Sequence, residues 1–328
     1  LLNPYERNKI KGTMTEKAEE KQYRCPGESY TISDSVCRGR QRVNYPKCNV
    51  CLEKIEPGGF AQSHAEPKLS INIFKSYDIR GKYPSELNDT TAHKIGTSIA
   101  LFFREKNPDV KNIVVGRDMR LSSKSLANAL IEGLCTAGLN VINVGVVSSE
   151  MTYFAVGHYK YDGGVMVTAS HNPAEYNGFK LCREQAIPVS FETGIDRISK
   201  LTKQYHPLRG EHLGKVIVSD IFADYKKHVL KFASNLRHLR VVIDAGNGMA
   251  GKTIPLVCEG LPIEIIPLYF ELDGSFPNHE ANPLKPENMV DLQKKVRETR
   301  AHLGVAFDGD ADRCVFVDEM GRINGCDI

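Results

Sequence analysis

Three aspartates alternate in the segment FDGDADRC near the end of the chain. They are Asp308, Asp310 and Asp312. Carboxylates this close repel one another unless a cation lies between them, and the small residues Gly309 and Ala311 let the backbone curl so that the oxygens converge. Mg2+ prefers hard oxygen ligands, whereas the spacing lacks the twelfth-position glutamate of a calcium-binding EF-hand loop. A solvated acidic turn is the alternative, but the triplet follows an apolar strand, so we predict a divalent metal site.

A second polar segment, GGVMVTASHNPAEYNGFK, runs from residue 163 to residue 180. Its apolar start predicts a strand that ends in a turn with Ser170, His171 and Asn172. Pro173 has no N–H and disfavours a helical conformation of the preceding residue, so the chain cannot simply continue the sheet. The serine hydroxyl is therefore expected at the carboxyl end of a strand, where open α/β sheets place their chemistry. A serine that only forms the turn is the alternative.

Together the two segments hold the groups that phosphoryl transfer requires, namely a serine oxygen, a divalent ion and cationic side chains. Ser170 would carry the phosphoryl group covalently, and Arg313 would hold a phosphate with its planar fork of donors. Lys180 and His171 are close enough in sequence to share the site, although hydrogen bonding within the turn explains His171 equally well. Arg80 reaches the site only if its strand lies near that of Ser170.

Strands and helices alternate from residue 71 onward, which indicates βαβ units and largely parallel sheets. In the first half we expect a strand over 73–81 that ends in a loop projecting Arg80, then a helix over 93–105 and a strand over 113–116. The helix that follows is expected to be capped by Ser122 or Ser123 and to end at Gly138. The cycle restarts near residue 216, with strands before the polar turns DAGNG and DGDADR. We predict two tandem three-layer αβα domains with mixed, largely parallel sheets that share a cleft.

The first 66 residues lack sustained helical or strand periodicity, so we expect an irregular N-terminal leader. Four of the nine cysteines lie there: Cys25, Cys37, Cys48 and Cys51. They could hold a structural Zn2+, although the segment has a single C-x2-C pair and idle thiols are the alternative. The other five are scattered singly, as a reducing compartment permits, and are expected to be free thiols. They are Cys135, Cys182, Cys258, Cys314 and Cys326.

Composition is that of an ordinary globular protein, with 41% hydrophobic and 25% charged residues in a chain of 328. The formal net charge of +3 does not demand a polyanion, and we expect no nucleic-acid partner. No apolar run approaches the roughly 20 residues of a membrane helix, and no signal-peptide core is visible. We therefore expect a cytoplasmic protein without a membrane partner.

The motifs FKSYDIRG, GRDMRLSS, TASHNPAEYNGFK, DAGNG, FPNH and DGDADR occur in this order between residues 69 and 328. This ordered set resembles the α-D-phosphohexomutase superfamily, and the form NGFK is closest to its phosphomannomutase/phosphoglucomutase branch. The resemblance implies that Ser170 is a phosphoserine that binds Mg2+ together with the three aspartates. It also implies that the reacting phosphate is surrounded by Arg80, Lys180 and Arg313, with Lys180 a candidate acid/base. Further candidates for phosphate binding are Asn172 and Arg117.

The resemblance implies interconversion of hexose 1-phosphate and hexose 6-phosphate through a bisphosphorylated sugar. It divides the chain into a leader (1–66), a phosphoserine domain (67–215), a metal-loop domain (216–320) and the start of a truncated third domain (321–328). The family's sugar-recognition and phosphate-gripping loops are not in the sequence, so a phosphoglucosamine or phosphopentose mutase stays open, as does a non-catalytic zinc- or phosphate-binding module. The metal loop reads DADR where the family commonly has DGDR, and we expect the alanine to be tolerated.

Overall fold

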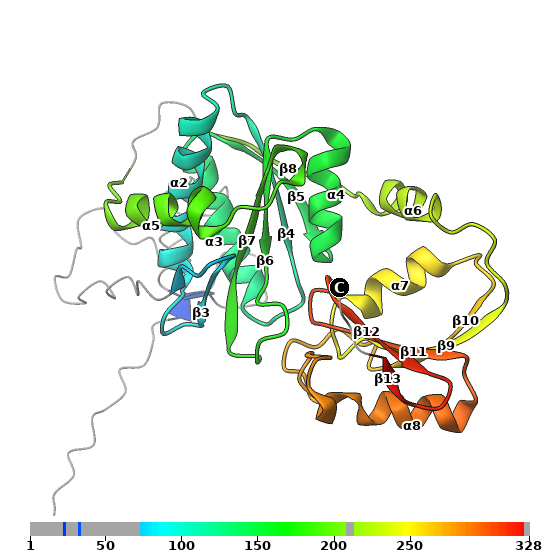
Figure 1. Cartoon of the computed structure of the whole chain (residues 1–328). Coiled ribbons are helices and arrows are strands. Elements are labelled where there is room, and N and C mark those ends of the chain that lie inside the picture. Colours follow the sequence, from blue (N-terminus) through cyan, green and yellow to red (C-terminus); the bar gives the residue numbers. More distant parts are fainter. Residues whose placement is uncertain (1–21, 24–31, 34–72, 208–212, 325–328) are drawn as a thin grey trace, which may run out of the picture. The chain divides into compact units, whose positions relative to one another are not determined.

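A computed structural model describes residues 22–23, 32–33, 73–207 and 213–324 (Figure 1). The chain forms two compact units, 1–67 and 68–328. In the first unit, β1 (Gln22–Tyr23) pairs antiparallel with β2 (Ile32–Ser33). The four cysteines of the predicted zinc site lie outside the described residues. Among the described residues, no helix has the length and apolar character needed to cross a membrane.

A six-stranded mixed sheet forms the core of the first domain, with the strand order β3-β7-β6-β4-β5-β8. Its strands are β3 (Ile79–Lys82), β4 (Asn112–Arg117), β5 (Asn140–Val146), β6 (Gly163–Val167), β7 (Tyr176–Arg183) and β8 (Val216–Val218). The pairs β4–β5, β4–β6 and β5–β8 are parallel, whereas β7 runs antiparallel to both of its neighbours, β6 and β3. This order brings the strand of Lys180 between the strand of Arg80 and the strand that leads to Ser170.

Helices cover both faces of this sheet, as the αβα prediction requires (Figure 1). They are α2 (Asp89–Lys106), α3 (Ser123–Thr136), α4 (Ser149–Tyr159) and α5 (Asp196–Lys203), with short helical turns at Glu184–Ala186 and Phe191–Ile195. The apolar residues of α2, α3 and α5 pack with Val115 and Val165 in one cluster, while those of α4 pack with Val114 and Ile142 in another. The predicted apolar stripe of α3 is confirmed, since Leu126, Leu130 and Leu134 are fully buried.

The second domain has a five-stranded mixed sheet with the order β10-β9-β11-β12-β13. Its strands are β9 (Leu239–Asp244), β10 (Ile263–Leu268), β11 (Leu303–Phe307), β12 (Cys314–Asp318) and β13 (Ile323–Asn324). Its helices are α6 (Phe222–Leu230), α7 (Ala250–Cys258) and α8 (Val290–Thr299), with a 3-10 turn at Pro286–Met289. The strands β10, β9 and β11 are parallel, and β12 and β13 add antiparallel edges.

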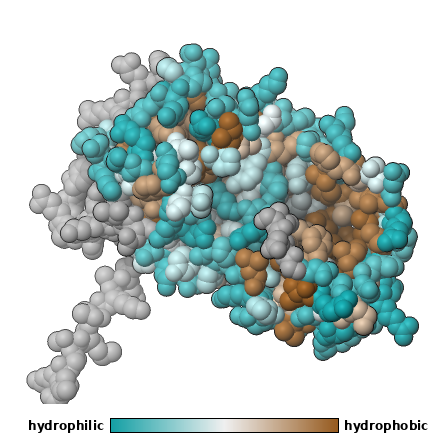
Figure 2. Space-filling view, in the orientation of Figure 1, coloured by the Kyte–Doolittle hydropathy of each residue, from teal (hydrophilic) through white to brown (hydrophobic). Residues whose placement is uncertain are grey.

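The two faces of the second sheet are covered unequally. On the α8 side, Leu292 and Val296 pack on Val242 in a cluster whose core residues are nearly all solvent-free. On the α7 side, more of the apolar side chains are only partly buried. Figure 2 shows hydrophobic residues gathered around α6 and α7, where Phe232 and Leu256 are exposed.

Several local predictions need correction. The predicted strand over 73–81 is instead a bend followed by the short β3, so Arg80 lies within a strand and not in a loop beyond it. Ser122 precedes α3 but makes no capping hydrogen bond, because its hydroxyl accepts one from Asn177 of β7. Gly138 does follow the helix end with a positive φ of 82°.

Both predicted boundaries of the second domain separate a strand from the sheet to which it belongs. β8 pairs with β5 of the first sheet, although the predicted boundary after residue 215 places it in the second domain. β13 extends the second sheet through β12, although residues from 321 onward were assigned to a third domain. The free-thiol prediction is confirmed for Cys135, Cys182 and Cys258, and Cys326 lies outside the described residues.

Candidate active site

The serine turn begins three residues after β6, at the carboxyl end of the strand as predicted. Ser170 is 1% exposed and has a φ of 52°, in the left-handed region that a side chain with a Cβ rarely adopts. Holding a non-glycine residue there costs on the order of 1–3 kcal/mol and requires support from the surroundings. One support is the hydroxyl of Thr168, which accepts a hydrogen bond of 2.8 Å from the Ser170 N–H.

A buried arginine supplies the rest of this support. Arg120, 1% exposed, donates to the carbonyl oxygens of the turn: Ser170 (2.8 Å), Asn172 (2.6 Å), Pro173 (2.8 Å) and Tyr176 (3.1 Å). Its Nε lies 3.3 Å from the carboxylate of Asp118, which is also solvent-free. Burial raises the pKa of Asp118 and lowers that of Arg120, and the attraction between the two opposes both shifts.

The second domain also contacts this arginine. The Phe276 ring centroid lies 4.9 Å from the guanidinium carbon, a distance typical of a cation–π contact. At Gly274 a Cβ would lie 2.6 Å from the Cα of Arg120, so the chain can come this close only without a side chain. The sequence motif GRDMRLSS contains Arg120 but does not assign it to the site, because nothing in its sequence context shows that it is buried.

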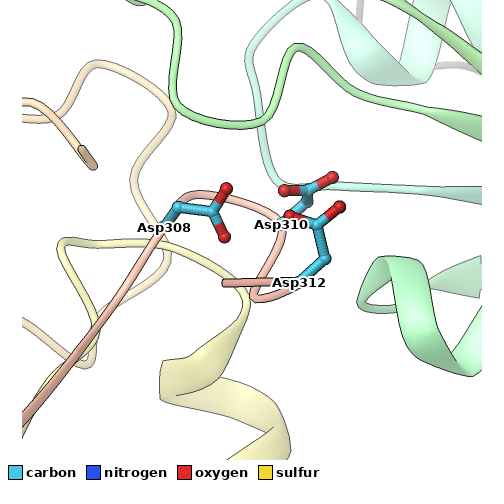
Figure 3. A group of neighbouring side chains, drawn as sticks. All are labelled: Asp308, Asp310 and Asp312. Atoms are coloured by element: carbon cyan, nitrogen blue, oxygen red, sulfur yellow. The ribbon is translucent and has the colours of Figure 1, made fainter. Parts of the chain in front are cut away.

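The three aspartates lie on the turn that follows β11 (Figure 3). Asp308 and Asp310 are fully buried, Asp312 is exposed, and one oxygen or more from each lies within 4.8 Å of the others. Oδ1 of Asp310 is buried and accepts no hydrogen bond. Gly309 permits close contact with the serine turn, since a Cβ there would lie 2.5 Å from the Ser170 carbonyl oxygen. The predicted convergence of the carboxylates is therefore present.

Direct hydrogen bonds join the serine to the metal loop. Ser170 Oγ donates to Asp308 Oδ2 at 2.7 Å, and Arg313 Nη2 donates to the same serine oxygen at 2.5 Å. Arg313 also donates to Asp308 at 2.7 Å and contacts Nδ1 of His171. The serine oxygen thus lies between a carboxylate and a guanidinium group, which is the arrangement that a phosphoryl acceptor beside a cation site needs.

Lys180 lies on the other side of the carboxylates. Its ammonium group donates to Asp310 Oδ2 at 2.7 Å and to Asp312. The hydroxyl of Ser149, the first residue of α4, also donates to Asp310 Oδ2, at 2.6 Å. Burial lowers the pKa of Lys180, but the charges of the two aspartates outweigh burial and raise the pKa above its usual value. Lys180 is therefore protonated near pH 7.

The electrostatics of the carboxylates favour an added cation. Burial and repulsion from the other two aspartates raise the pKa of Asp308, while Lys180 lowers the pKa of Asp310 in spite of burial. Burial and the nearby arginines lower the pKa of His171 to about 4, so its ring is neutral near pH 7. The three carboxylates carry one more charge than the two cationic groups that contact them, Lys180 and Arg313. A bound divalent ion would change this net negative charge to a positive one.

The remaining predicted residues separate into two groups. Arg80 lines the pocket, where its Nη1 donates to Asn172 Oδ1 at 2.5 Å and its Nη2 pairs with Asp78, so Asn172 reaches the site through Arg80 and does not line the pocket itself. Arg117 does not join it: its guanidinium donates to the Asp118 carbonyl at 3.3 Å, and it is absent from the lining of the pocket. That pocket has a volume of about 350 Å3 and is lined by Tyr77, Asp78, Arg80, Tyr153, Ser170, His171, Lys180, Leu181, Pro188, Asp312 and Arg313.

The donor set fits a divalent metal ion. The clustered carboxylates are hard oxygen ligands, and the buried Asp310 oxygen without a partner is an atom that a cation would satisfy. A serine on a strained turn, an acidic metal-binding loop and three cationic side chains define a site of the phosphoryl-transfer type on tandem αβα domains.

Comparisons with known proteins identify the family. The model for phosphoglucomutase/phosphomannomutase α/β/α domain I matches residues 72–208, and the model for domain II matches residues 222–321. The chain therefore belongs to the phosphoglucomutase/phosphomannomutase family, which confirms the resemblance found in the sequence motifs.

Individual relatives agree with this assignment. The chain is 41% identical over 258 residues to a phosphomannomutase of Vibrio cholerae, and 42% identical over 256 residues to phosphohexose mutases of Xanthomonas campestris. The first match covers 76% of this chain and the second 77%, and each covers 56% of the relative. A solved family member from Burkholderia thailandensis superimposes with a TM-score of 0.71 at 34% identity, covering 78% of this chain and 56% of that one. The chain thus spans about half the length of the curated relatives it matches.

Proposed function

We propose that the protein is a phosphohexomutase that moves a phosphoryl group between the 1 and 6 positions of a hexose phosphate by way of phosphorylated Ser170. The observation that carries the proposal is the position of the serine oxygen, 2.7 Å from Asp308 and 2.5 Å from Arg313. A serine that only formed a turn would not need a metal-binding loop and a guanidinium group at its hydroxyl. Family membership and the names of the relatives support the same reading.

The chain's own residues divide the work of the transfer. Arg120 and Thr168 hold the serine turn, so the acceptor oxygen is already placed before a substrate arrives. Asp308 accepts the hydroxyl hydrogen bond and so orients the serine oxygen toward the carboxylate cluster. Arg313 and Arg80 provide planar forks of donors for phosphate oxygens, and Lys180, beside the carboxylates, is the candidate acid/base for the sugar oxygen.

Mg2+ is the metal we propose for the carboxylate cluster. Asp308, Asp310 and Asp312 would hold it, together with the oxygen or the phosphate of Ser170. When bound, Mg2+ neutralises charge that develops on the transferred phosphoryl group. Lys180 now pairs with two of the three carboxylates, so it is the residue whose contacts a bound ion would rearrange.

The substrate proposed is a phosphorylated hexose. The Vibrio cholerae relative is named a phosphomannomutase and the Xanthomonas campestris relatives phosphohexose mutases, which favours a hexose over a pentose. A phosphoglucosamine or phosphopentose mutase remains an alternative, because the groups that carry the proposal would serve phosphate and metal in any such mutase. A structural Zn2+ in the leader, a non-catalytic module and a cytoplasmic location stay predictions.

The direct test is phosphorylation of the chain by glucose 1,6-bisphosphate with Mg2+. The wild-type chain should gain a phosphoryl group, and Ser170→Ala should gain none. Ser149→Ala is the matched control, because that hydroxyl also contacts the carboxylates but lies outside the serine turn, and it should still be phosphorylated. Equal labelling of Ser170→Ala and the wild type would contradict the assignment.

A further inference from the structure

One pocket residue has no role in the function proposed so far. Tyr153 lies in α4, one helical turn after Ser149, and residues spaced by four share a face of a helix. Ser149 contacts Asp310 through both its hydroxyl and its N–H, so this face of α4 meets the metal loop. Among the pocket-lining residues that the structure describes, Tyr153 is the one that α4 contributes.

The surroundings of Tyr153 fix its ring and leave its hydroxyl available. The ring packs against the apolar cluster between α4 and the sheet. A tyrosine with a packed ring at the wall of a cavity presents its polar end to that cavity. Within the described part of the chain, no hydrogen bond involves the Tyr153 hydroxyl.

The charged groups near this hydroxyl belong to the candidate active site. Burial raises the pKa of Tyr153, Lys180 opposes the shift, and Asp310 and Asp312 add to it. The phenol therefore remains protonated across the physiological range and is a neutral donor. The hydroxyl is not among the buried polar atoms without a partner, so a ligand in the pocket can reach it.

We propose that Tyr153 contacts the substrate: its hydroxyl donates a hydrogen bond to an oxygen of the bound hexose phosphate, beside Lys180. The proposal rests on the phosphohexomutase function and adds a neutral donor beside the cationic groups of Arg80, Lys180 and Arg313. The ammonium group of Lys180 is a point charge on a flexible stem, whereas a packed phenol holds its hydroxyl in one place. Tyr153 thus helps to orient the sugar phosphate for attack by Ser170.

Tyr153→Phe tests this proposal because it removes one oxygen and keeps the ring. The assay is phosphorylation of the full chain as a function of glucose 1,6-bisphosphate concentration. The half-saturating concentration should rise about fivefold, as expected for the loss of one hydrogen bond to a ligand. Tyr161→Phe is the matched control, since Tyr161 packs against the same cluster but does not line the pocket, and it should behave as the wild type.

The outcomes separate this proposal from the proposed function. If the wild type is phosphorylated but Tyr153→Phe has the half-saturating concentration of Tyr161→Phe, the tyrosine proposal is overturned and the function stands. If the wild type is not phosphorylated, the proposed function fails. The Tyr153 contact is then tested by itself, by measuring the affinity for glucose 6-phosphate by calorimetry. Equal affinities of Tyr153→Phe and Tyr161→Phe would overturn the contact. The melting temperature of Tyr153→Phe should stay within about 2 °C of the wild type, because no protein hydrogen bond is lost. A large fall in melting temperature with unchanged half-saturation would assign the hydroxyl a structural role and refute the contact.

Discussion

Arg120→Lys tests whether a buried guanidinium group holds the serine turn in its strained conformation. Arg120 gives four hydrogen bonds to carbonyl oxygens of the turn and pairs with Asp118. A lysine keeps the charge near Asp118, but its single ammonium group cannot reach all four carbonyls. At least two charge-assisted hydrogen bonds are lost, each contributing roughly 1.5–3 kcal/mol. The free energy of unfolding should therefore fall by about 3–5 kcal/mol, or roughly 10 °C in melting temperature.

The same substitution should slow phosphorylation of Ser170. Once the turn is released from its left-handed conformation, the hydroxyl is less often placed against Asp308 and Arg313. If placing the hydroxyl for reaction costs about 1.4 kcal/mol more free energy, the rate falls tenfold. We therefore expect the rate of phosphorylation to fall by about tenfold or more. The rate is measured with glucose 1,6-bisphosphate at a temperature well below the melting point of the variant, so that unfolding does not contribute.

Arg117→Lys is the matched control for Arg120→Lys. Arg117 lies three residues away at the end of β4, and among the described residues its guanidinium group makes one hydrogen bond, of 3.3 Å to a carbonyl oxygen. Its replacement should cost less than about 1 kcal/mol and leave phosphorylation unchanged. If Arg120→Lys melts within about 2 °C of the wild type and is phosphorylated at the wild-type rate, the support attributed to the guanidinium group is refuted.

Three further predictions concern the second domain. Asp310→Asn removes a ligand charge and should weaken Mg2+ binding by calorimetry at least tenfold, and an unchanged titration would count against the metal site. Ala311 has a φ of 62°, so Ala311→Gly should raise the free energy of unfolding in urea by about 0.5–1 kcal/mol, and a lowered midpoint would contradict the strain. Burial lowers the pKa of His279, but the 3.0 Å contact with Asp244 outweighs burial and raises it. The stability that this pair contributes is thus complete below about pH 6.5 and is lost as pH rises through the folded-state pKa of His279. The difference in unfolding free energy between the wild type and His279→Gln should therefore become smaller toward high pH, and a difference that grows would contradict this.

The chemistry-bearing turns could be predicted because both follow the carboxyl ends of apolar strands. To predict Ser170 and the three aspartates as site residues, no knowledge of tertiary packing is needed beyond the rule that such strand ends face a common cleft. Arg313 follows the aspartate turn directly, and in the structure it donates a hydrogen bond to Ser170. The order of the strands was harder to predict, since β7 returns antiparallel beside β6 and so brings Lys180 and Arg80 to the serine turn.

Two arginines show where sequence reasoning fails. Arg117 and Arg120 both leave the end of β4 in the motif GRDMR, and both are equally plausible partners for a phosphate. In the structure, Arg120 is solvent-free and holds the serine turn, whereas Arg117 stays with its own strand. Which of two neighbouring charges becomes buried depends on carbonyl groups that arrive from residues 170–176. Tyr153 was missed for a similar reason, because its place in the pocket depends on how α4 meets the metal loop.

The most direct test of the account is the location of the phosphoryl group after reaction. The wild-type chain is incubated with Mg2+ and glucose 1,6-bisphosphate, and the peptide that contains residues 163–180 is examined by tandem mass spectrometry. The account predicts a single added phosphoryl group on Ser170, dependent on Mg2+. An unmodified serine under these conditions, or a phosphoryl group on a different residue, would contradict it.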